Sequence, residues 1–191
     1  MAHISIIGTG NMGQAIAGLA GRGGNTFELL DTTTLGTPLA GDIVVLAVPH
    51  TSVDDVLTRR GAELDGRIVV DITNPVDVET FDGLVVPPDS SAAARIAARL
   101  PGARVLKAFN TTFAGAVAGG SVGPVTTTVL IAGDDGDAKS ALAAVVSAGG
   151  LRAVDVGSLK RARELEALGF LQISLAATEK ITWTGGFALV S

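Results

Sequence analysis

Residues 3–13, His-Ile-Ser-Ile-Ile-Gly-Thr-Gly-Asn-Met-Gly, join a short apolar strand to a Gly-x-Gly-x-x-Gly loop, and a helical pattern follows at once. In such a loop Gly8 permits the tight turn, Gly10 lets the backbone approach a pyrophosphate, and Gly13 lets the helix pack on the strand. The phosphates lie at the helix N-terminus, where free N–H groups and the helix dipole favour an anion. The stretch predicts dinucleotide binding. The alternative is a structural glycine turn, because a chain with 25 glycines contains Gly-x-Gly by chance.

Composition narrows the class of protein. At 191 residues the chain is long enough for one well-buried domain. The net charge of −5, without a cluster of lysine and arginine, argues against nucleic acid or an anionic membrane surface as partner. No apolar run approaches the roughly 18 residues that span a bilayer. With no cysteine and two histidines, we expect no disulfide and no metal site. We therefore expect a cytoplasmic α/β protein.

Strand and helix patterns alternate along the chain. The expected strands cover residues 3–7, 26–30, 43–48, 67–71, 103–108, 126–132 and 151–155. The expected helices cover residues 11–21, 51–60, 90–100, 112–118, 135–148 and 159–178. Several strands are continuously apolar, as in strands covered on both faces. The alternation predicts a Rossmann-type, doubly wound parallel sheet, with residues 1–158 as the dinucleotide-binding domain.

Two segments depart from this alternation. Residues 31–42 hold two glycines and a proline and are too few for a full crossover helix, so we expect a loop or a single turn there. Residues 159–191 form a short C-terminal extension, a helix followed by an apolar tail. Such a tail is expected to pack back on the domain or to complete a homodimer.

Asp31 ends the second strand, 18 residues beyond Gly13. A carboxylate there can accept hydrogen bonds from the adenosine ribose and repels the 2′-phosphate of NADP, which favours NAD. The alternative is a solvated turn aspartate, helped by Thr32, Thr33 and Thr34. The threonine hydroxyls could also bind a phosphate, so NADP stays open.

Other polar candidates follow later strands, at the edge where open α/β sheets bind ligands. Val48, Pro49 and His50 follow the third strand, and Asn74 and Pro75 follow the fourth. We expect these turns to border the ribose and nicotinamide. His50 could pack on the cofactor, donate a proton, or simply begin the next helix.

The fifth strand ends in Lys107, and Asn110 and Thr111 follow. A buried lysine without a partner is costly, so we expect Lys107 to reach solvent or the ligand cleft. Asn110 and Thr111 could bond a carboxamide or cap the next helix. The charged residues of 160–166 are interpreted as helix-surface pairs, and Ser90 and Ser91 as an N-cap. No nucleophile–base pair is recognisable, which fits hydride transfer between bound cofactors.

Six stretches carry a family resemblance, in the family's order and over most of the chain: IIGTGNMG at 6–13, VVLAVPH at 44–50, IVVDITNP at 68–75, VLKAFNT at 105–111, IAGDD at 131–135 and ARELE at 162–166. The sequence resembles the NADPH-dependent reductases of the deazaflavin coenzyme F-420 and the small dinucleotide-binding oxidoreductases around them. The resemblance implies a Rossmann domain with a short C-terminal extension, usually dimeric, in which nicotinamide exchanges hydride with a flavin-like ring.

Site residues follow from the resemblance by position. The pyrophosphate would contact Gly8, Thr9, Gly10, Asn11, Met12 and Gly13. The ribose and nicotinamide would be bordered by Val48, Pro49, His50, Asn74 and Pro75, and the nicotinamide or its acceptor by Ala108, Phe109 and Asn110. One position departs from the family, because NADP-using members typically carry Gly-Ser-Arg where this chain has Asp31, Thr32 and Thr33.

The leading hypothesis is an NAD(P)-dependent oxidoreductase with a flavin or deazaflavin acceptor. A hydroxy-acid or imine dehydrogenase usually adds a long helical substrate domain, for which this chain is too short. The remaining alternative is a non-catalytic NAD(P) sensor, or a module serving a partner. A sensor would fill or cap the space beyond the nicotinamide, for instance with the tail at 183–187, whereas an oxidoreductase leaves it open.

Overall fold

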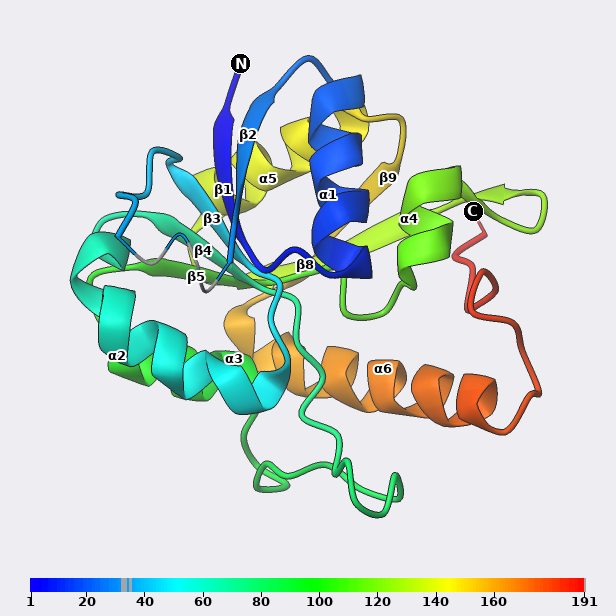
Figure 1. The fold of residues 1–191 in the computed structure, drawn as a ribbon. Helices are drawn as coiled ribbons and strands as arrows, with labels where there is room; N and C mark the ends of the chain where they lie inside the picture. The colour runs from blue at the N-terminus through cyan, green and yellow to red at the C-terminus, as the bar shows by residue number, and fades with distance from the viewer. Residues whose placement is uncertain (32–33, 35, 191) are drawn as a thin grey trace.

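The computed structural model describes residues 1–31, 34 and 36–190. Within them, seven strands form one sheet in the order β2-β1-β3-β4-β5-β8-β9 (Figure 1). Its strands are β1 (His3–Ile7), β2 (Thr26–Leu30), β3 (Ile43–Leu46), β4 (Ile68–Asp71), β5 (Arg104–Lys107), β8 (Thr128–Gly133) and β9 (Arg152–Gly157). Strands β1 to β5 pair in parallel, which confirms the predicted Rossmann-type α/β fold.

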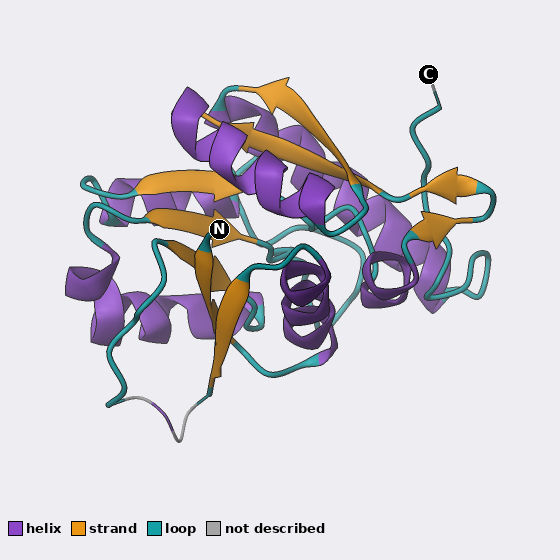
Figure 2. Cartoon of the chain, turned by 90° about the horizontal axis from the view of Figure 1, so that it is seen from above, coloured by secondary structure: helices purple, strands orange, loops and turns teal. Residues whose placement is uncertain are grey.

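The predicted all-parallel sheet is wrong at one pair, because β8 runs antiparallel to β5, with Leu106 opposite Gly133. The connection between them holds only the short helix α4 (Ala114–Gly119) and a small hairpin of β6 (Ser121–Val122) and β7 (Val125–Thr126). A six-residue helix rises only about 9 Å, and this connection does not return the chain to the start of β5. Figure 2 shows the hairpin standing apart from the main sheet.

Helices cover both faces of the sheet (Figure 1). One face carries α1 (Asn11–Arg22), α4 and α5 (Gly136–Ala148), and the other carries α2 (Val53–Leu64), α3 (Ala92–Arg99) and α6 (Ala162–Ala177). Two 3₁₀ turns precede helices, η2 (His50–Ser52) before α2 and η3 (Leu159–Arg161) before α6. Ser91 caps α3 as predicted, since its hydroxyl accepts a hydrogen bond from the Ala94 N–H at 3.0 Å.

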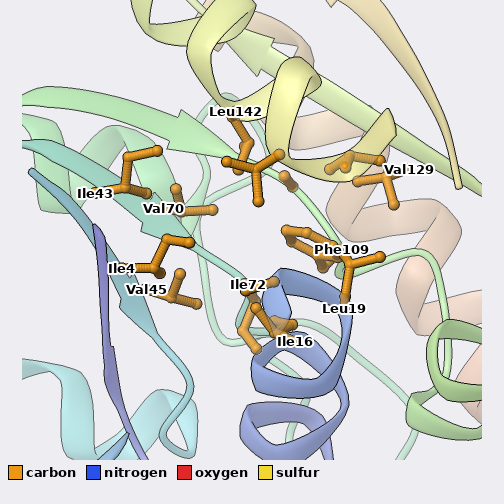
Figure 3. Packing of buried hydrophobic residues seen from close by; sticks show 14 of the residues in the cluster. Ile4, Ile16, Leu19, Ile43, Val45, Val70, Ile72, Phe109, Val129 and Leu142 are labelled. Atoms are coloured by element: carbon orange, nitrogen blue, oxygen red, sulfur yellow. The ribbon is translucent and has the colours of Figure 1, made fainter. Parts of the chain in front are cut away.

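The strand alternation divides the core into two layers. Ile43 and Val45 of β3 face the layer of α1 and α5, whereas Val44 and Leu46 face the layer of α2 and α3. Figure 3 shows the first layer, in which Phe109 packs beside Leu19 of α1. Both faces of the central strands are therefore buried, which explains their continuously apolar sequences.

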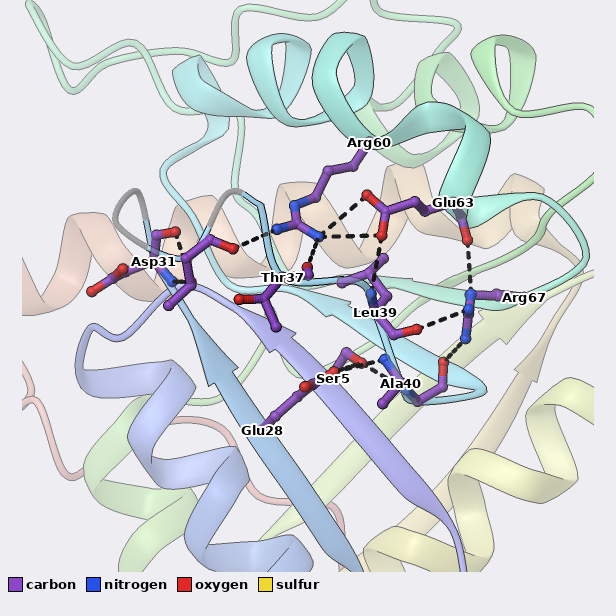
Figure 4. Close-up of polar contacts among 11 residues, drawn as sticks. Ser5, Glu28, Asp31, Thr37, Leu39, Ala40, Arg60, Glu63 and Arg67 are labelled. Atoms are coloured by element: carbon purple, nitrogen blue, oxygen red, sulfur yellow. Dashed lines mark hydrogen bonds and ion pairs between the residues drawn. The ribbon is translucent and has the colours of Figure 1, made fainter.

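The described part of residues 31–42 contains no α-helix, as the sequence predicted. Side chains of α2 and of the turn after it hold this loop instead (Figure 4). The Arg60 guanidinium donates to the carbonyls of Thr34 and Thr37 at 2.9 and 3.0 Å, and Arg67 donates to the Leu39 carbonyl at 3.0 Å. Hydrogen bonds from the buried Arg60 and the half-buried Arg67 thus hold the loop in place of a crossover helix.

No helix among the described residues is long and apolar enough to cross a membrane. The C-terminal tail folds back on its own domain, where the Phe187 N–H donates to Gln172 Oε1 at 3.1 Å and Arg152 donates to the Leu189 carbonyl at 3.2 Å. Several of its apolar side chains stay exposed, among them Trp183, Phe187, Leu189 and Val190.

Candidate functional site

The glycine loop connects β1 to α1 through close backbone contacts. Gly8 has φ of 123°, and a Cβ there would lie 2.1 Å from the Ala47 carbonyl oxygen. A Cβ on Gly13 would lie 2.1 Å from the Gly8 oxygen. A Cβ on Gly10, by contrast, would meet nothing within 4 Å, and Gly10 begins α1 without a side-chain cap. Gly8 and Gly13 are therefore required by the fold, while Gly10 leaves open space at the N-terminus of α1, where backbone N–H groups favour an anion.

Two cavities adjoin this loop and share Val48 and Pro49. The first, here called the Asp31 cavity, measures about 470 Å³. Residues of β1, β2 and α2 line it, including Gly8, Thr9, Asp31, Asp55, Arg59 and Arg60. The second, the Asn110 cavity, measures about 330 Å³. Its lining includes Asn11, Met12, His50, Thr73, Asn74, Asn110, Phe113 and Trp183. The two cavities lie on either side of one turn, as the two halves of a dinucleotide require.

Asp31 lies at the Asp31 cavity, where its backbone N–H donates to Thr34 Oγ1 at 2.8 Å. Thr32 and Thr33, the other residues predicted at this position, lie outside the described part of the chain. The sequence interpretation missed Arg59 and Arg60. Asp55 and Arg59 are four residues apart and share one face of α2, but this spacing does not show that the face adjoins the end of β2.

Buried polar atoms without a partner gather at the Asn110 cavity. Among the described residues, four buried side-chain atoms make no hydrogen bond, and His50 Nδ1, Thr73 Oγ1 and Asn110 Oδ1 are three of them. All three residues line this cavity. Leaving such atoms unpaired costs about 1 to 3 kcal/mol each, and a ligand that supplied partners to these atoms would recover that free energy. Thr73 was not predicted from the sequence.

Asn74 and Asn110 hold each other in place. The Asn110 side-chain amide donates to Asn74 Oδ1 at 3.0 Å, and the Asn74 amide donates to the Asn110 carbonyl at 3.0 Å. Asn110 also donates to the Leu165 carbonyl of α6 at 2.8 Å. These bonds leave Asn110 Oδ1 as the available acceptor, which suits a carboxamide N–H.

Gly169 of α6 makes this arrangement possible, because a Cβ there would lie 2.3 Å from Asn74 Oδ1 and 2.8 Å from the backbone carbonyl oxygen of Asn110. We expect Gly169→Ala to displace the asparagine pair and to weaken reduced-nicotinamide binding by about tenfold, or 1.4 kcal/mol. Nucleotide titrations followed by fluorescence measure this. Gly18→Ala in α1 is the matched control, since its Cβ meets only Arg22 Nη1 at 3.7 Å. Equal affinity in both variants would contradict the assigned role of the pair.

Three other predicted residues lie away from the cavity linings. Ala108 and Phe109 are fully buried in the core layer of α1 and α5. The Pro75 carbonyl accepts the Val85 N–H at 2.8 Å and so anchors the segment 76–91. Ala108 and Phe109 thus fix the backbone that presents Asn110, and Pro75 fixes the backbone that follows Asn74.

His50 lies at the start of η2, half-buried beside the Asn110 cavity. Burial lowers the pKa of its imidazole below the ordinary value of 6.5, and the nearby Asp71 carboxylate opposes this effect. The ring is therefore mainly neutral at neutral pH. A neutral ring carries one donor and one acceptor nitrogen, so His50 is suited to hydrogen bonding with an uncharged ring substituent.

Lys107 corrects the sequence interpretation, because it reaches neither solvent nor the cleft. Its fully buried Nζ lies 2.8 Å from Asp71 Oδ2, 2.9 Å from Glu166 Oε1 and 2.6 Å from the Thr73 carbonyl. Glu166, predicted as a surface residue of α6, is also fully buried and accepts the Ala92 N–H at 2.9 Å. The cluster ties α6 and α3 to the strand ends beside the cavity.

The tail contributes Trp183 to the Asn110 cavity. Its ring lies 5.0 Å from the Phe113 ring, tilted by 56°, and its side chain is 56% exposed. The tail therefore lines the cavity and leaves about 330 Å³ of it open. Within the described residues, no group of His, Cys, Asp and Glu could hold a metal ion.

Comparison with known proteins gives a consistent assignment. No family model matches the chain. The F420-dependent NADP reductase of Methanothermobacter thermautotrophicus is 30% identical over 174 residues, which cover 87% of this chain and 73% of that relative. The Methanocaldococcus jannaschii enzyme of the same name is 32% identical over 149 residues, 76% of this chain and 66% of the relative. The chain thus spans just under two thirds of the latter's length.

A solved structure supports the fold. The crystal structure of a proposed F420-dependent NADP-reductase from Arthrobacter sp. FB24 superposes with a TM-score of 0.84 and covers 100% of both chains. At 24% identity this likeness concerns the fold alone. The sequence matches, the shared fold and the glycine loop agree, and the chain belongs to the F420-dependent NADP reductase family.

Proposed function

We propose that this protein is an NAD(P)-dependent oxidoreductase that transfers hydride between nicotinamide and a deazaflavin, coenzyme F-420, or a flavin-like ring. The observation that carries the proposal is the Asn110 cavity, where three unpartnered buried atoms adjoin the open glycine loop. The family assignment supports the deazaflavin as the acceptor ring and NADP(H) as the nucleotide.

Each group has a role that its position supports. The N–H groups at the start of α1, next to Gly10, bind the pyrophosphate. Asn110 Oδ1 accepts the carboxamide N–H and so fixes the face of the nicotinamide that is presented. His50 and Thr73 bond the remaining polar atoms of the bound rings. The nicotinamide supplies the hydride chemistry, and the protein supplies orientation and exclusion of water.

The wider organisation is part of the same proposal. Residues 1–158 bind the dinucleotide, and residues 159–191, the C-terminal helix and tail, pack on this domain and line the acceptor side of the site without filling it. The exposed apolar side chains of the tail support a homodimer, because an apolar patch of this kind is usually covered. A cytoplasmic location is supported by the lack of cysteine.

A non-catalytic sensor is the second candidate, since a sensor also needs a dinucleotide site. A sensor has no use for space beside the nicotinamide, whereas Trp183 lines the Asn110 cavity without filling it. This observation favours an enzyme.

The test is anaerobic turnover of purified protein with NADPH or NADH and either the deazaflavin or FMN as acceptor. We expect nicotinamide oxidation that depends on the acceptor. Tight nucleotide binding without turnover of either acceptor would favour the sensor, and no binding of either nucleotide would refute both functions.

A further inference from the structure

The curated relatives are named as NADP reductases, yet this chain carries a carboxylate at the end of β2, beside the cavity next to the glycine loop. Asp31 lines the Asp31 cavity at the end of β2. A carboxylate in that place repels a 2′-phosphate. Binding of NADP(H) therefore needs a positive charge from another element of the cavity wall. The following inference rests on the proposed function.

Two arginines of α2 line the same cavity, and their hydrogen bonds differ. Arg60 is 3% exposed, and both of its terminal nitrogens are used. They donate to the Thr34 and Thr37 carbonyls at 2.9 and 3.0 Å, and Nη1 also lies 3.3 Å from Glu63. Figure 4 shows these contacts. Both terminal nitrogens of Arg60 are thus used in hydrogen bonds that hold the loop after β2.

Arg59 is held at one end only. Its Nε donates to Asp55 Oδ1 at 2.7 Å, and its side chain is 54% exposed. Its terminal nitrogens, Nη1 and Nη2, make no hydrogen bond to any residue in the described part of the chain. Asp55 also lines the cavity, so the carboxylate orients the guanidinium along the cavity wall.

This arrangement suits a phosphate. A guanidinium presents its N–H groups as a planar fork that binds two phosphate oxygens at once. A carboxylate on Nε reduces the freedom of the side chain and leaves that fork available. An exposed ion pair such as Arg59–Asp55 contributes only about 0 to 1 kcal/mol to stability, so folding alone explains little of this arrangement.

We propose that Arg59, oriented by Asp55, binds the 2′-phosphate of NADP(H) and lets this chain use the phosphorylated nucleotide despite Asp31. In this proposal the phosphate-binding residue belongs to helix α2. Arg59 is a specificity-determining residue that acts on the nucleotide and has no part in hydride transfer.

The test compares NADPH and NADH dissociation constants for the unchanged protein and for Arg59→Gln. Trp183 is the single tryptophan and lines the Asn110 cavity, so energy transfer from it to the reduced nicotinamide reports binding. We expect Arg59→Gln to weaken NADPH at least about tenfold and to leave NADH within about twofold. Arg59→Lys restores part of the NADPH affinity, because a lysine keeps the charge without the fork.

Arg99→Gln is the matched control. Arg99 makes a similar exposed pair, with Nη1 2.6 Å from Asp54 Oδ1, and does not line the Asp31 cavity. We expect the Arg99→Gln protein to bind both nucleotides with the affinity of the unchanged protein. Equal weakening of NADPH and NADH in Arg59→Gln, unchanged NADPH affinity, or a parent protein that binds NADH alone would each overturn the role of Arg59. A parent protein that binds neither nucleotide would instead refute the proposed function.

Discussion

Gly10→Val is expected to weaken the binding of reduced nicotinamide nucleotides about a hundredfold, or 2.7 kcal/mol, in a protein that still folds. The backbone at Gly10 has φ of −71° and ψ of −178°, which valine readily adopts, and a Cβ there meets nothing within 4 Å. The added side chain occupies the space that the pyrophosphate needs at the start of α1. Fluorescence titration gives the affinity, and urea unfolding gives the stability.

Gly83→Val is the control for this change, because a Cβ on Gly83 also meets nothing within 4 Å and its loop lines neither cavity. We expect it to bind nucleotide like the parent protein. If a folded Gly10→Val protein kept the parent affinity, the glycine loop would be only a turn, and the site would have to lie elsewhere.

Lys107→Met is expected to lower the free energy of unfolding by about 3 to 5 kcal/mol. The change leaves the carboxylates of Asp71 and Glu166 buried together without their shared cation, and both are fully buried. Lys139→Met is the comparison, because its partner Asp155 is half-exposed and such pairs contribute at most about 1 kcal/mol. Equilibrium urea unfolding of both variants measures the difference.

The double variant Lys107→Met/Glu166→Gln separates charge from packing. Glutamine keeps an acceptor for the Ala92 N–H, which Glu166 accepts at 2.9 Å, and it removes one of the two uncompensated charges. We therefore compare the loss of unfolding free energy in the double variant with the sum of the losses in the two single variants. We expect the loss in the double variant to be smaller than this sum by at least about 1 kcal/mol. Simple additivity would mean that the ion cluster does not act as a unit.

The sequence predicted the fold well where the local pattern decides it. The parallel half of the sheet is specified by the glycine loop and by the apolar strands that begin at residues 3 and 43. These strands are continuously apolar because each is covered on both faces. The reversal of β8 could not be predicted in the same way. It depends on the path of residues 108–127 over α1, a tertiary feature that leaves no periodic signal.

The site was predictable at the strand ends and less so elsewhere. Asn110 and His50 follow strands, so their place at the cleft follows from the topology. Glu166 and Lys107 form a pair 59 positions apart in the chain, and sequence spacing cannot show such a contact. The same holds for Arg59, whose helix position gives no sign that the loop after β2 lies beside it.

Direct hydride transfer in the Asn110 cavity can be followed with an isotope label on the nicotinamide. Two samples of NADPH, one deuterated on each face of nicotinamide C4, are incubated separately and anaerobically with the protein and the oxidised deazaflavin, and both products are analysed by mass spectrometry. We expect deuterium in the reduced deazaflavin from only one of the two samples, because the Asn110 and Asn74 pair fixes the ring orientation. Equal amounts of deuterium from the two samples, or reduced deazaflavin without deuterium in both of them, would contradict direct transfer from a nicotinamide held in one orientation.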